Sequence, residues 1–370
     1  MAIDTTRLPT TAEALTPAWL TDALHSTRTL AGSARVSACD ARPLGAGGGL
    51  IGLVASVRLE YAGDAGGAPR QLIAKFPSPV AANRAVADTY DMYGREVRFY
   101  QDLSASTRLG HPRCYFAARS PANSDFVLLL EDLSERRIGD QVAGSDLADA
   151  EVVIDAMAAF HAESWGRTHE ARYAWVSSHA NDAQIAGMEA GFAFGWPRFM
   201  NELAEIIPAR VLAWGGRVGP STRDLLTRMC SGPLVIAHAD FRLENIFFAA
   251  QPEHPAFSIL DWQSITKSSP GQDLAYFLTQ SVQLEVRRKH ERALLDRYRE
   301  GLRAAGVRDY THDQLWHDYR LSALYLLDYA VTIAATLDLA NARGAAIARA
   351  LSQRSCAALD DLECERLLRG

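Results

Sequence analysis

The feature that most constrains the fold is the stretch HADFRLENIFF at residues 238–248. It follows the apolar run 233–237 and ends in apolar residues again, so Asp240 is expected in a turn between two short strands. Asn245 follows five residues after Asp240, and Asp261 ends another apolar run sixteen residues beyond Asn245. Buried polar groups without partners are costly, so two acids and an amide at strand ends favour a chemical role over packing.

Size and charge limit the class of protein. With 370 residues, of which 48% are hydrophobic, the chain can bury a sizeable core and form two lobes. A formal net charge of −6 gives no general excess of basic groups, so nucleic acid is not an expected partner. The most apolar segment, 321–340, is interrupted by Asp328 and Asp338 and is expected to be a buried helix rather than a membrane span.

The cysteines and the first residues indicate a cytoplasmic protein. The five cysteines are scattered and form no CxxC pair, which argues against a disulfide framework and against a zinc site. The segment MAIDTTRLPTTAEALTPAWL has neither the basic region nor the apolar core of a secretion signal. We therefore expect reduced thiols and a cytoplasmic location.

A glycine-rich segment, LGAGGGLIGLVASVRLEY, precedes the motif by almost two hundred residues. Its glycines Gly47, Gly49 and Gly52 have the G-x-G-x-x-G spacing, which in a dinucleotide-binding fold would be followed by a helix. Here apolar and charged residues alternate from 57 to 61, which is typical of a strand. A glycine loop between two strands indicates the phosphate-covering flap of a kinase, and the alternative is a plain hairpin turn.

Two charged residues are expected to meet inside the N-terminal part of the chain. Lys75 lies in the apolar strand QLIAKF, and Glu96 lies on the apolar stripe of a following helix, with Tyr93 and Tyr100. An ion pair between Lys75 and Glu96 would hold the lysine against nucleotide phosphates, as in kinases. The alternative is a surface lysine whose stem alone is covered.

The strand DFVLLL predicts the crossover between two lobes. It runs from Phe126 to Leu130 and ends in Glu131 and Asp132, and the backbone from Leu130 to Leu133 could receive the edge of an adenine. We take Glu131 and Leu133 as candidate nucleotide-binding residues, with a solvated strand end as the alternative. The chain then becomes mainly helical, apart from two short strands around residues 238–248.

In the next helix, DLADAEVVIDAMAAFHAESW, His161 is expected to be a packing histidine.

The spacing H-x-D-x-x-x-x-N matches the catalytic loop of phosphoryl-transfer enzymes of the protein-kinase type. Such a reaction needs a carboxylate that orients and deprotonates the acceptor hydroxyl, and hard oxygen ligands that hold Mg²⁺ on the phosphates. Asp240 fits the first role, and Asn245 with Asp261 fits the second. Glycine loop, lysine, glutamate, loop and final aspartate occur in the required order.

At this level the sequence resembles the aminoglycoside phosphotransferase and choline kinase superfamily, and within it the ecdysteroid kinase-like group. The resemblance is carried by GAGGGLIG, IAKF, REVRFYQDL, LLLEDLS, AAFHAESW, HADFRLENIFF, ILDWQ and PGQDLAYFL. It implies a two-lobed kinase-like fold, ATP as donor, Mg²⁺ and a small-molecule hydroxyl as acceptor. It also implies that Asp273 braces the catalytic loop through backbone hydrogen bonds and that His238 orients the loop. A helix cap is the alternative for Asp273.

Three positions depart from the patterns of related kinases. Ala239 replaces the glycine usual before the catalytic aspartate. Arg242 stands where protein kinases often carry a lysine, so it could supply positive charge to the transition state, with an exposed loop arginine as the alternative. Trp262 and Gln263 follow Asp261 in place of Phe-Gly, which argues against a mobile regulatory loop.

The acceptor is predicted from the stretch between Trp165 and Trp214. It holds four of the seven tryptophans and several other aromatic residues, and only five acids, so an apolar alcohol is favoured over a polycationic aminoglycoside. A later helix, with a capping box of Thr311 and Gln314, places four further pocket candidates on one face: Tyr325, Asp328, Tyr329 and Thr332. For each aromatic residue, a place in the core of a helical lobe is the alternative.

These expectations combine into an α+β, two-lobed kinase-like protein. Residues 1–132 form the nucleotide-binding lobe, with a small antiparallel sheet, and residues 133–370 form the helical lobe with the catalytic loop and acceptor site. The predicted activity is ATP- and Mg²⁺-dependent phosphorylation of a sterol-like or lipid-like alcohol. The alternatives are an aminoglycoside, macrolide or choline-type phosphotransferase and a nucleotide-binding pseudokinase. The choice of ATP or GTP and the oligomeric state stay open.

Overall fold

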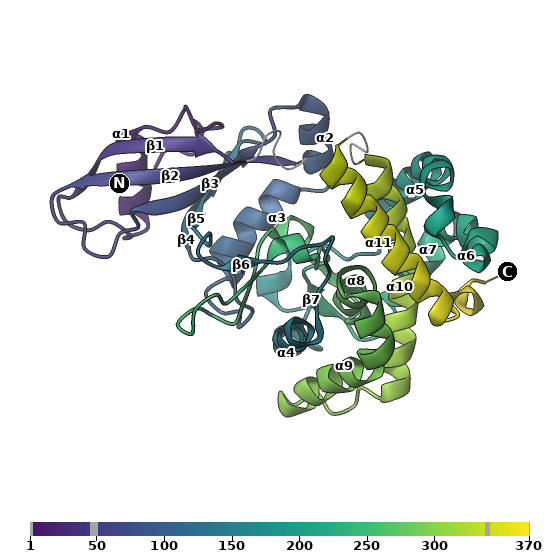
Figure 1. The fold of residues 1–370 in the computed structure, drawn as a ribbon. Helices are drawn as coiled ribbons and strands as arrows, with labels where there is room; N and C mark the ends of the chain where they lie inside the picture. Colours follow the sequence, from purple (N-terminus) through teal and green to yellow (C-terminus); the bar gives the residue numbers. More distant parts are fainter. Residues whose placement is uncertain (1–2, 45–50, 337–340, 370) are drawn as a thin grey trace. The chain divides into compact units, whose positions relative to one another are not determined.

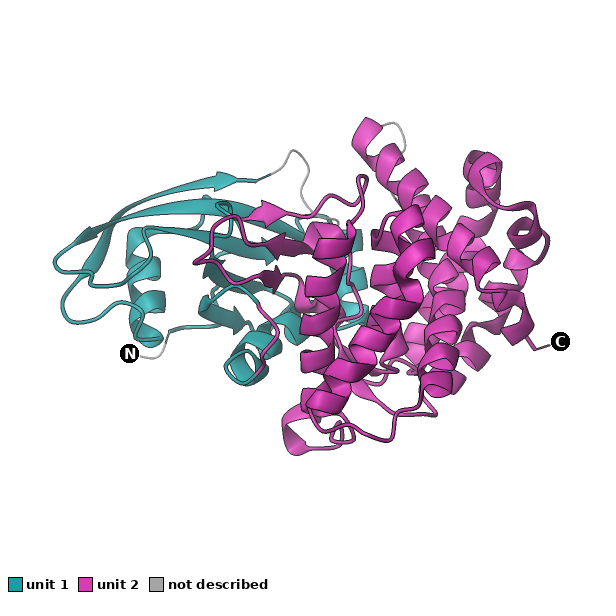
Figure 2. Ribbon diagram, turned by 60° about the horizontal axis from the view of Figure 1, so that its bottom comes forward, with its two compact units in different colours: residues 1–106, 111–135 teal, residues 107–110, 136–370 magenta. Residues whose placement is uncertain are grey.

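The chain forms two compact units, shown in Figure 2, each described here by itself. The computed structural model describes residues 3–44, 51–336 and 341–369. Unit 1 comprises residues 1–106 and 111–135, and unit 2 comprises residues 107–110 and 136–370. The division falls after Glu135 rather than after Asp132, and the segment 107–110 joins the second unit. The functions predicted for the two lobes stay predictions.

Unit 1 contains an antiparallel sheet of five strands in the order β1-β2-β3-β5-β4 (Figure 1). In β2 the buried Val57 and Leu59 alternate with the exposed Arg58 and Glu60, so one face of the strand is in the core and the other is in solvent, as the sequence predicts. The strands are β1 (Arg35–Pro43), β2 (Gly52–Ala62), β3 (Gln71–Pro77), β4 (Cys114–Arg119) and β5 (Phe126–Glu131).

Helices cover both faces of this sheet, because in β3 the buried Ala74 and Phe76 belong to one cluster with Leu20 and Leu24, whereas Lys75 between them pairs with Glu96. Helix α1 (Pro17–Ser26) begins at Thr16, whose hydroxyl accepts a hydrogen bond from the Trp19 N–H, and packs against β1. Helices α2 (Ala81–Thr89) and α3 (Met92–Arg98) follow β3, and α3 continues as the π-helix η1 (Phe99–Leu103). The predicted apolar stripe is present, since Tyr93, Glu96 and Tyr100 are all buried.

Unit 2 is mainly helical, with two small sheets that frame the predicted catalytic loop. The sheets are β6-β8-β9 and β10-β7. Strands β7 and β8 flank the loop as predicted, whereas β6 and β10 are too short to leave an alternating pattern in the sequence. The strands are β6 (Arg137–Ile138), β7 (Val235–Ala237), β8 (Ile246–Phe248), β9 (Phe257–Ile259) and β10 (Thr266–Ser268).

Helix α10 is the central helix of unit 2 and packs against α5, α7, α8 and α11. Thr311 and Gln314 form the predicted capping box at its start, through hydrogen bonds of 2.9–3.2 Å. Among the described residues, no helix is long and apolar enough to cross a membrane. The helices are α4 (Leu147–Ser164), α5 (Asp182–Leu203), α6 (Ala209–Trp214), α7 (Val218–Met229), α8 (Gly271–Tyr276), α9 (Leu284–Ala304), α10 (His312–Thr336) and α11 (Ala342–Asp361), and α8 continues as the π-helix η7 (Phe277–Ser281).

Candidate active site

One buried carboxylate holds the turn between β7 and β8. Asp273, on α8, is 0% exposed and accepts hydrogen bonds from the backbone N–H groups of His238 and Ala239, both at 2.8 Å. Without Asp273, these two N–H groups would be buried without partners. The structure therefore contains the bracing contact that the resemblance implies. Asp273 also lies in the first turn of α8, so its helix-cap role, which is compatible with the brace, stays a prediction.

A histidine and a tyrosine support Asp273 from its other side. His161 is 0% exposed, with Nε2 at 3.1 Å from Asp273 and Nδ1 at 2.7 Å from the Tyr298 hydroxyl. These partners fit a ring that donates from Nε2 and accepts at Nδ1. Burial raises the pKa of Asp273, but the hydrogen bonds from His161 and from the Ala239 N–H lower it, and the net pKa lies below its usual value. His161 is the satisfied packing histidine that the sequence predicts.

The turn has a backbone conformation that favours glycine. Ala239 has a φ of 63°, in the left-handed region, which costs an L-residue about 1–2 kcal/mol. Alanine in place of glycine at this position therefore costs stability. The hydrogen bonds from the His238 and Ala239 N–H groups to Asp273 hold the strained turn in place.

The carboxylate of Asp240 has a defined set of donors. The Tyr276 hydroxyl donates to Oδ1 at 2.9 Å, and the Asn245 amide donates to Oδ2 at 3.0 Å. Tyr276 is 1% exposed, and burial followed by the charge of Asp240 raises its pKa well above the usual value, so it stays a donor. The Asp240 side chain keeps 19% of its surface exposed, which leaves an open approach to an oriented carboxylate.

Arg242 points at the same carboxylate. Its Nε lies 3.6 Å from Asp240 Oδ2, and the charge of Asp240 raises the pKa of Arg242. The side chain is 36% exposed, so it is neither buried nor a fully solvated loop arginine. A role for this charge in phosphoryl transfer stays a prediction.

Two backbone contacts tie the segment before Asp261 to the loop. The Leu260 carbonyl lies 2.9 Å from His238 Nε2, and the Leu260 N–H donates to the Asn245 carbonyl at 2.8 Å. His238 Nδ1 in turn accepts from the Asp240 N–H at 3.2 Å. His238 therefore orients the loop. Leu260 bridges His238 and Asn245, and Asp261 follows Leu260 in the chain.

The donor atoms of this part of unit 2 suit a hard divalent cation. The amide nitrogen of Asn245 faces Asp240, so its amide oxygen is the atom directed elsewhere. Asp261 follows Leu260, whose N–H bonds the Asn245 carbonyl, and would add a carboxylate. Amide and carboxylate oxygens are the ligands that Mg²⁺ prefers, so the residues fit the predicted metal.

In unit 1, Lys75 and Glu96 form the expected ion pair. Lys75 Nζ lies 2.7 Å from Glu96 Oε2, and their side chains are 13% and 1% exposed. Gly52 lies in β2, where a Cβ atom would come within 2.9 Å of the Phe76 carbonyl, so close packing on β3 requires a glycine there. Gly47 and Gly49 lie outside the described residues. Nucleotide binding by these residues stays a prediction.

The strand end predicted to meet a nucleotide is engaged within unit 1. The Glu131 side chain accepts from the Arg113 N–H at 3.0 Å, and the Glu131 N–H donates to the Arg113 carbonyl at 2.8 Å. Leu133 is buried. The side chain of Glu131 therefore has a structural contact with the residue before β4, and the nucleotide role of Glu131 and Leu133 stays untested.

Several aromatic residues between Trp165 and Trp214 belong to the core, whereas Phe194 is 75% exposed. Trp196 stacks between the buried Phe192 and Phe199, at ring-centroid distances of 5.2 Å and 5.6 Å. Tyr325, a predicted pocket residue, is 0% exposed. Aromatic density alone therefore does not locate an acceptor site.

Sequence reasoning missed two residues that contact the loop. Tyr276 belongs to the quoted motif PGQDLAYFL, but no spacing rule distinguishes its hydroxyl from a core ring. Gln141 accepts from the Leu243 N–H at 2.9 Å across 102 residues, and a lone glutamine carries no recognisable pattern.

The comparisons with known proteins decide the family. Residues 46–307 match the ecdysteroid kinase-like family, which is more than half of the chain. The chain belongs to the ecdysteroid kinase-like family. It is therefore a member of the kinase-like phosphotransferases, as the sequence motifs predict. No curated protein matches the sequence significantly.

Solved structures with the same fold extend over almost the whole of this ecdysteroid kinase-like protein. A proposed aminoglycoside phosphotransferase of Ralstonia eutropha JMP134 has a TM-score of 0.56 at 14% identity, covering 95% of this chain and 99% of its own. The GDP complex of aminoglycoside 2'-phosphotransferase-IIIa has a TM-score of 0.54 at 12% identity, covering 94% and 100%. The ethanolamine kinase of Plasmodium vivax has a TM-score of 0.52 at 9% identity, covering 88% and 83%. The predicted α+β, two-lobed kinase-like fold is thus confirmed.

Proposed function

We propose that this protein transfers the γ-phosphoryl group of ATP, with Mg²⁺, to a hydroxyl group of a largely apolar small molecule. The observation that carries the proposal is the Asp240 carboxylate, which is partly exposed, oriented by Tyr276 and Asn245, and held in a turn that Asp273 braces. A binding module has no need of such an oriented base. Membership in a family of phosphotransferases supports the same conclusion.

In this proposal each residue has one task. Asp240 accepts the proton of the acceptor hydroxyl, and its hydrogen bonds from Tyr276 and Asn245 fix the direction of the carboxylate. Lys75, held by Glu96, binds nucleotide phosphates, and Arg242 offsets negative charge that develops during transfer. Asn245 and Asp261 would hold Mg²⁺, which supplies charge neutralisation on the phosphates when bound.

The rest of the nucleotide site is proposed from position in the chain. Gly47, Gly49 and Gly52 would cover the phosphates, and Glu131 and Leu133 would flank the adenine. The named GDP complex among the similar structures supports a nucleotide donor but leaves the base open. We keep ATP as the donor and the cytoplasm as the location.

The charges of unit 2 support an acceptor without several ammonium groups. Most acids between Trp165 and Trp214 already have an arginine partner within 3.4 Å, which leaves few carboxylates for a polycation: Glu170 with Arg172, Asp182 with Arg223, Glu202 with Arg198, and Glu205 with Arg349. A sterol-like or lipid-like alcohol remains our proposal.

A face of α10 near the base suits an apolar acceptor. The half-exposed Tyr329 packs its ring edge-to-face on Tyr276 at 5.8 Å, and Tyr276 donates to Asp240. Thr332 and Ile333 are also half-exposed and lie one turn further along the same helix. This face would present an aromatic ring and an apolar side chain to the acceptor.

The test compares the unaltered protein with Asp240→Asn, incubated with Mg-ATP and a panel of sterols, lipid alcohols, choline and aminoglycosides. Mass spectrometry detects phosphorylated products. We expect a product from an apolar alcohol, formed by the unaltered protein and reduced about a thousandfold in the variant. A product from choline or an aminoglycoside would replace the apolar acceptor with the alternative, and nucleotide binding without any product would favour the pseudokinase.

A further inference from the structure

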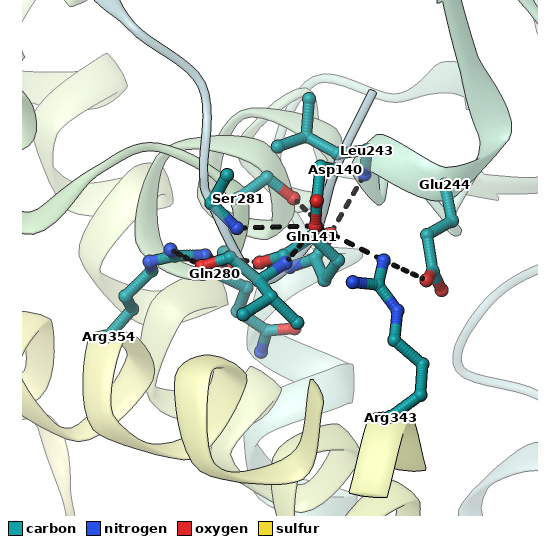
Figure 3. Close-up of polar contacts among 10 residues, drawn as sticks. Asp140, Gln141, Leu243, Glu244, Gln280, Ser281, Arg343 and Arg354 are labelled. Carbon is teal, nitrogen blue, oxygen red and sulfur yellow. Dashed lines mark hydrogen bonds and ion pairs between the residues drawn. The ribbon is translucent and has the colours of Figure 1, made fainter. Parts of the chain in front are cut away.

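A buried polar cluster connects helix α11 to the catalytic loop (Figure 3). Strand β6 pairs with β8, so the segment that follows β6 runs beside the loop. Gly139 lies so close to the loop that a Cβ atom at this residue would lie 2.5 Å from the Leu243 carbonyl oxygen. The cluster therefore joins four parts of unit 2 that are apart in the sequence: residues 139–144, the loop, η7 and α11.

Gln141 is the member that touches the loop. Its side chain is 0% exposed, and its Oε1 accepts from the Leu243 N–H at 2.9 Å and from the Ser281 hydroxyl at 3.2 Å. Its Nε2 donates to the Gln280 carbonyl at 2.8 Å. Because both ends of the amide are engaged, its orientation is fixed.

The bond to Leu243 satisfies a group that the loop cannot satisfy itself. Leu243 begins the 3₁₀ turn Leu243–Asn245, and the first N–H groups of such a turn have no partner within it. Leu243 lies between Arg242 and Asn245, the residues assigned above to charge stabilisation and metal binding. The Gln141 bond therefore fixes the part of the loop that presents these side chains.

Arg354, on α11, holds Gln141 in place. Its Nη1 donates to the Gln141 carbonyl at 2.6 Å and to the Gln280 carbonyl at 3.5 Å, and its Nη2 donates to the Val142 carbonyl at 2.7 Å. The residue is only 8% exposed, and the acid whose charge acts on it, Asp140, forms no ion pair with it in the described part of the chain. A buried cation that binds only carbonyl oxygens is expensive to desolvate, and its effect is to fix the backbone.

Gly144 shows how closely the segment fits this guanidinium. Its φ is 78°, and a Cβ atom there would lie 2.6 Å from Arg354 Nη2. Arg343, at the other end of α11, makes exposed contacts with Asp140 and Glu244 at 3.1 Å and 3.2 Å. Exposed ion pairs contribute little to stability, so the buried hydrogen bonds of Arg354 are the main link between α11 and residues 139–144.

We infer that Arg354 and Gln141 are positioning residues for the catalytic loop: Arg354 fixes the backbone at Gln141, and Gln141 fixes the loop at Leu243. This inference deepens the proposed function and rests on it for its effect on turnover. The geometric part concerns only the protein, so it can be tested without an acceptor or a nucleotide.

The first experiment measures amide hydrogen exchange by mass spectrometry in peptides covering residues 240–247. Arg354→Met and Gln141→Met should each speed exchange there at least tenfold, since a buried N–H loses its partner, while peptides of α4 and β3 are unchanged. Gln141→Glu keeps the acceptor for Leu243 and should retain most of the protection. Arg349→Met is the matched control, because Arg349 is on the same helix but bonds the exposed Glu205.

Unchanged exchange at 240–247 in Gln141→Met, or equal acceleration throughout unit 2 in every variant, would overturn the inference. If Arg354→Met does not fold, Arg354→Lys replaces it, because a lysine keeps the charge but lacks the planar fork whose two nitrogens reach the Gln141 and Val142 carbonyls, and partial acceleration is expected.

The second experiment separates positioning from general stability. In Arg354→Met, turnover of the acceptor found with the unaltered protein should fall about tenfold, while ATP affinity measured in EDTA stays within twofold, because unit 1 is unaltered. Equal losses of turnover and of ATP affinity would overturn the positioning role. Absence of turnover in the unaltered protein would defeat the proposed function alone, since the exchange result does not depend on it.

Discussion

Two carboxylates on the loop side of unit 2, Asp273 and Asp240, have opposite surroundings. Asp273 is 0% exposed and binds His161 and two backbone N–H groups. Asp240 keeps 19% of its side chain exposed and is oriented by two side-chain donors. A carboxylate enclosed by internal donors builds the loop, and one with an open side can meet a substrate. Substitutions should therefore affect stability at Asp273 and turnover at Asp240.

The largest expected loss of stability follows from a change at Asp273. Asp273→Asn should lower the free energy of unfolding by about 3 kcal/mol, because one of the two backbone N–H groups then faces an amide NH₂. Urea denaturation measures it. Asp240→Asn is the matched comparison and should change the free energy of unfolding by less than about 1 kcal/mol. Similar losses for the two variants would break the comparison.

The contacts of the candidate site could be predicted from the sequence to different degrees. The Lys75–Glu96 pair follows from helical and strand periodicity, and the motif around Asp240 indicates a turn between strands. The brace from Asp273 came only with the family resemblance. Tyr276 and Gln141 could not be found because their bonds span 36 and 102 residues and depend on tertiary packing. The acceptor predicted from the aromatic stretch stays a prediction, since the density of aromatic residues does not say which way their rings face.

A third acid, Asp328, sharpens the comparison because it is buried with too few donors. It is 0% exposed and accepts only from Thr222, at 2.9 Å, while its Oδ1 has no partner among the described residues. Burial raises its pKa to about 7. A raised pKa means that the folded state binds the proton more tightly, so stability falls as pH rises from about 4 to 7 and then levels off.

Asp328→Asn should remove this pH dependence and raise the free energy of unfolding above pH 7 by about 2–4 kcal/mol. Urea denaturation at pH 5, 6, 7 and 8 checks the slope. The exposed Asp309→Asn is the control and should follow the unaltered protein. Parallel curves for Asp328→Asn and the unaltered protein would show that Asp328 is ionised at little cost.

Removal of a single donor from Asp240 should have a smaller effect. Tyr276→Phe deletes the hydroxyl bonded to Oδ1, so Mg-ATP turnover with the acceptor found should fall about tenfold, the equivalent of roughly 1.4 kcal/mol. Steady-state kinetics measures it. Tyr319→Phe is the matched control, since Tyr319 is also buried and donates to a carboxylate, Glu291, away from the loop. Equal losses in both variants would assign the effect to stability.

The smallest effect concerns the backbone at Ala239, which donates a hydrogen bond to Asp273 and precedes Asp240 in the chain. Ala239 has a φ of 63°, so Ala239→Gly should relieve about 1–2 kcal/mol of strain and lose about 0.5–1 kcal/mol to the more flexible unfolded chain. The net gain of up to about 1.5 kcal/mol should appear in urea denaturation. Gly32, with the same φ and nothing within 4 Å of a Cβ atom, gives the reverse test: Gly32→Ala should destabilise by a similar amount. If Ala239→Gly destabilises instead, the bonds from Asp273 fix a turn that prefers alanine, and the strain is carried elsewhere in the loop.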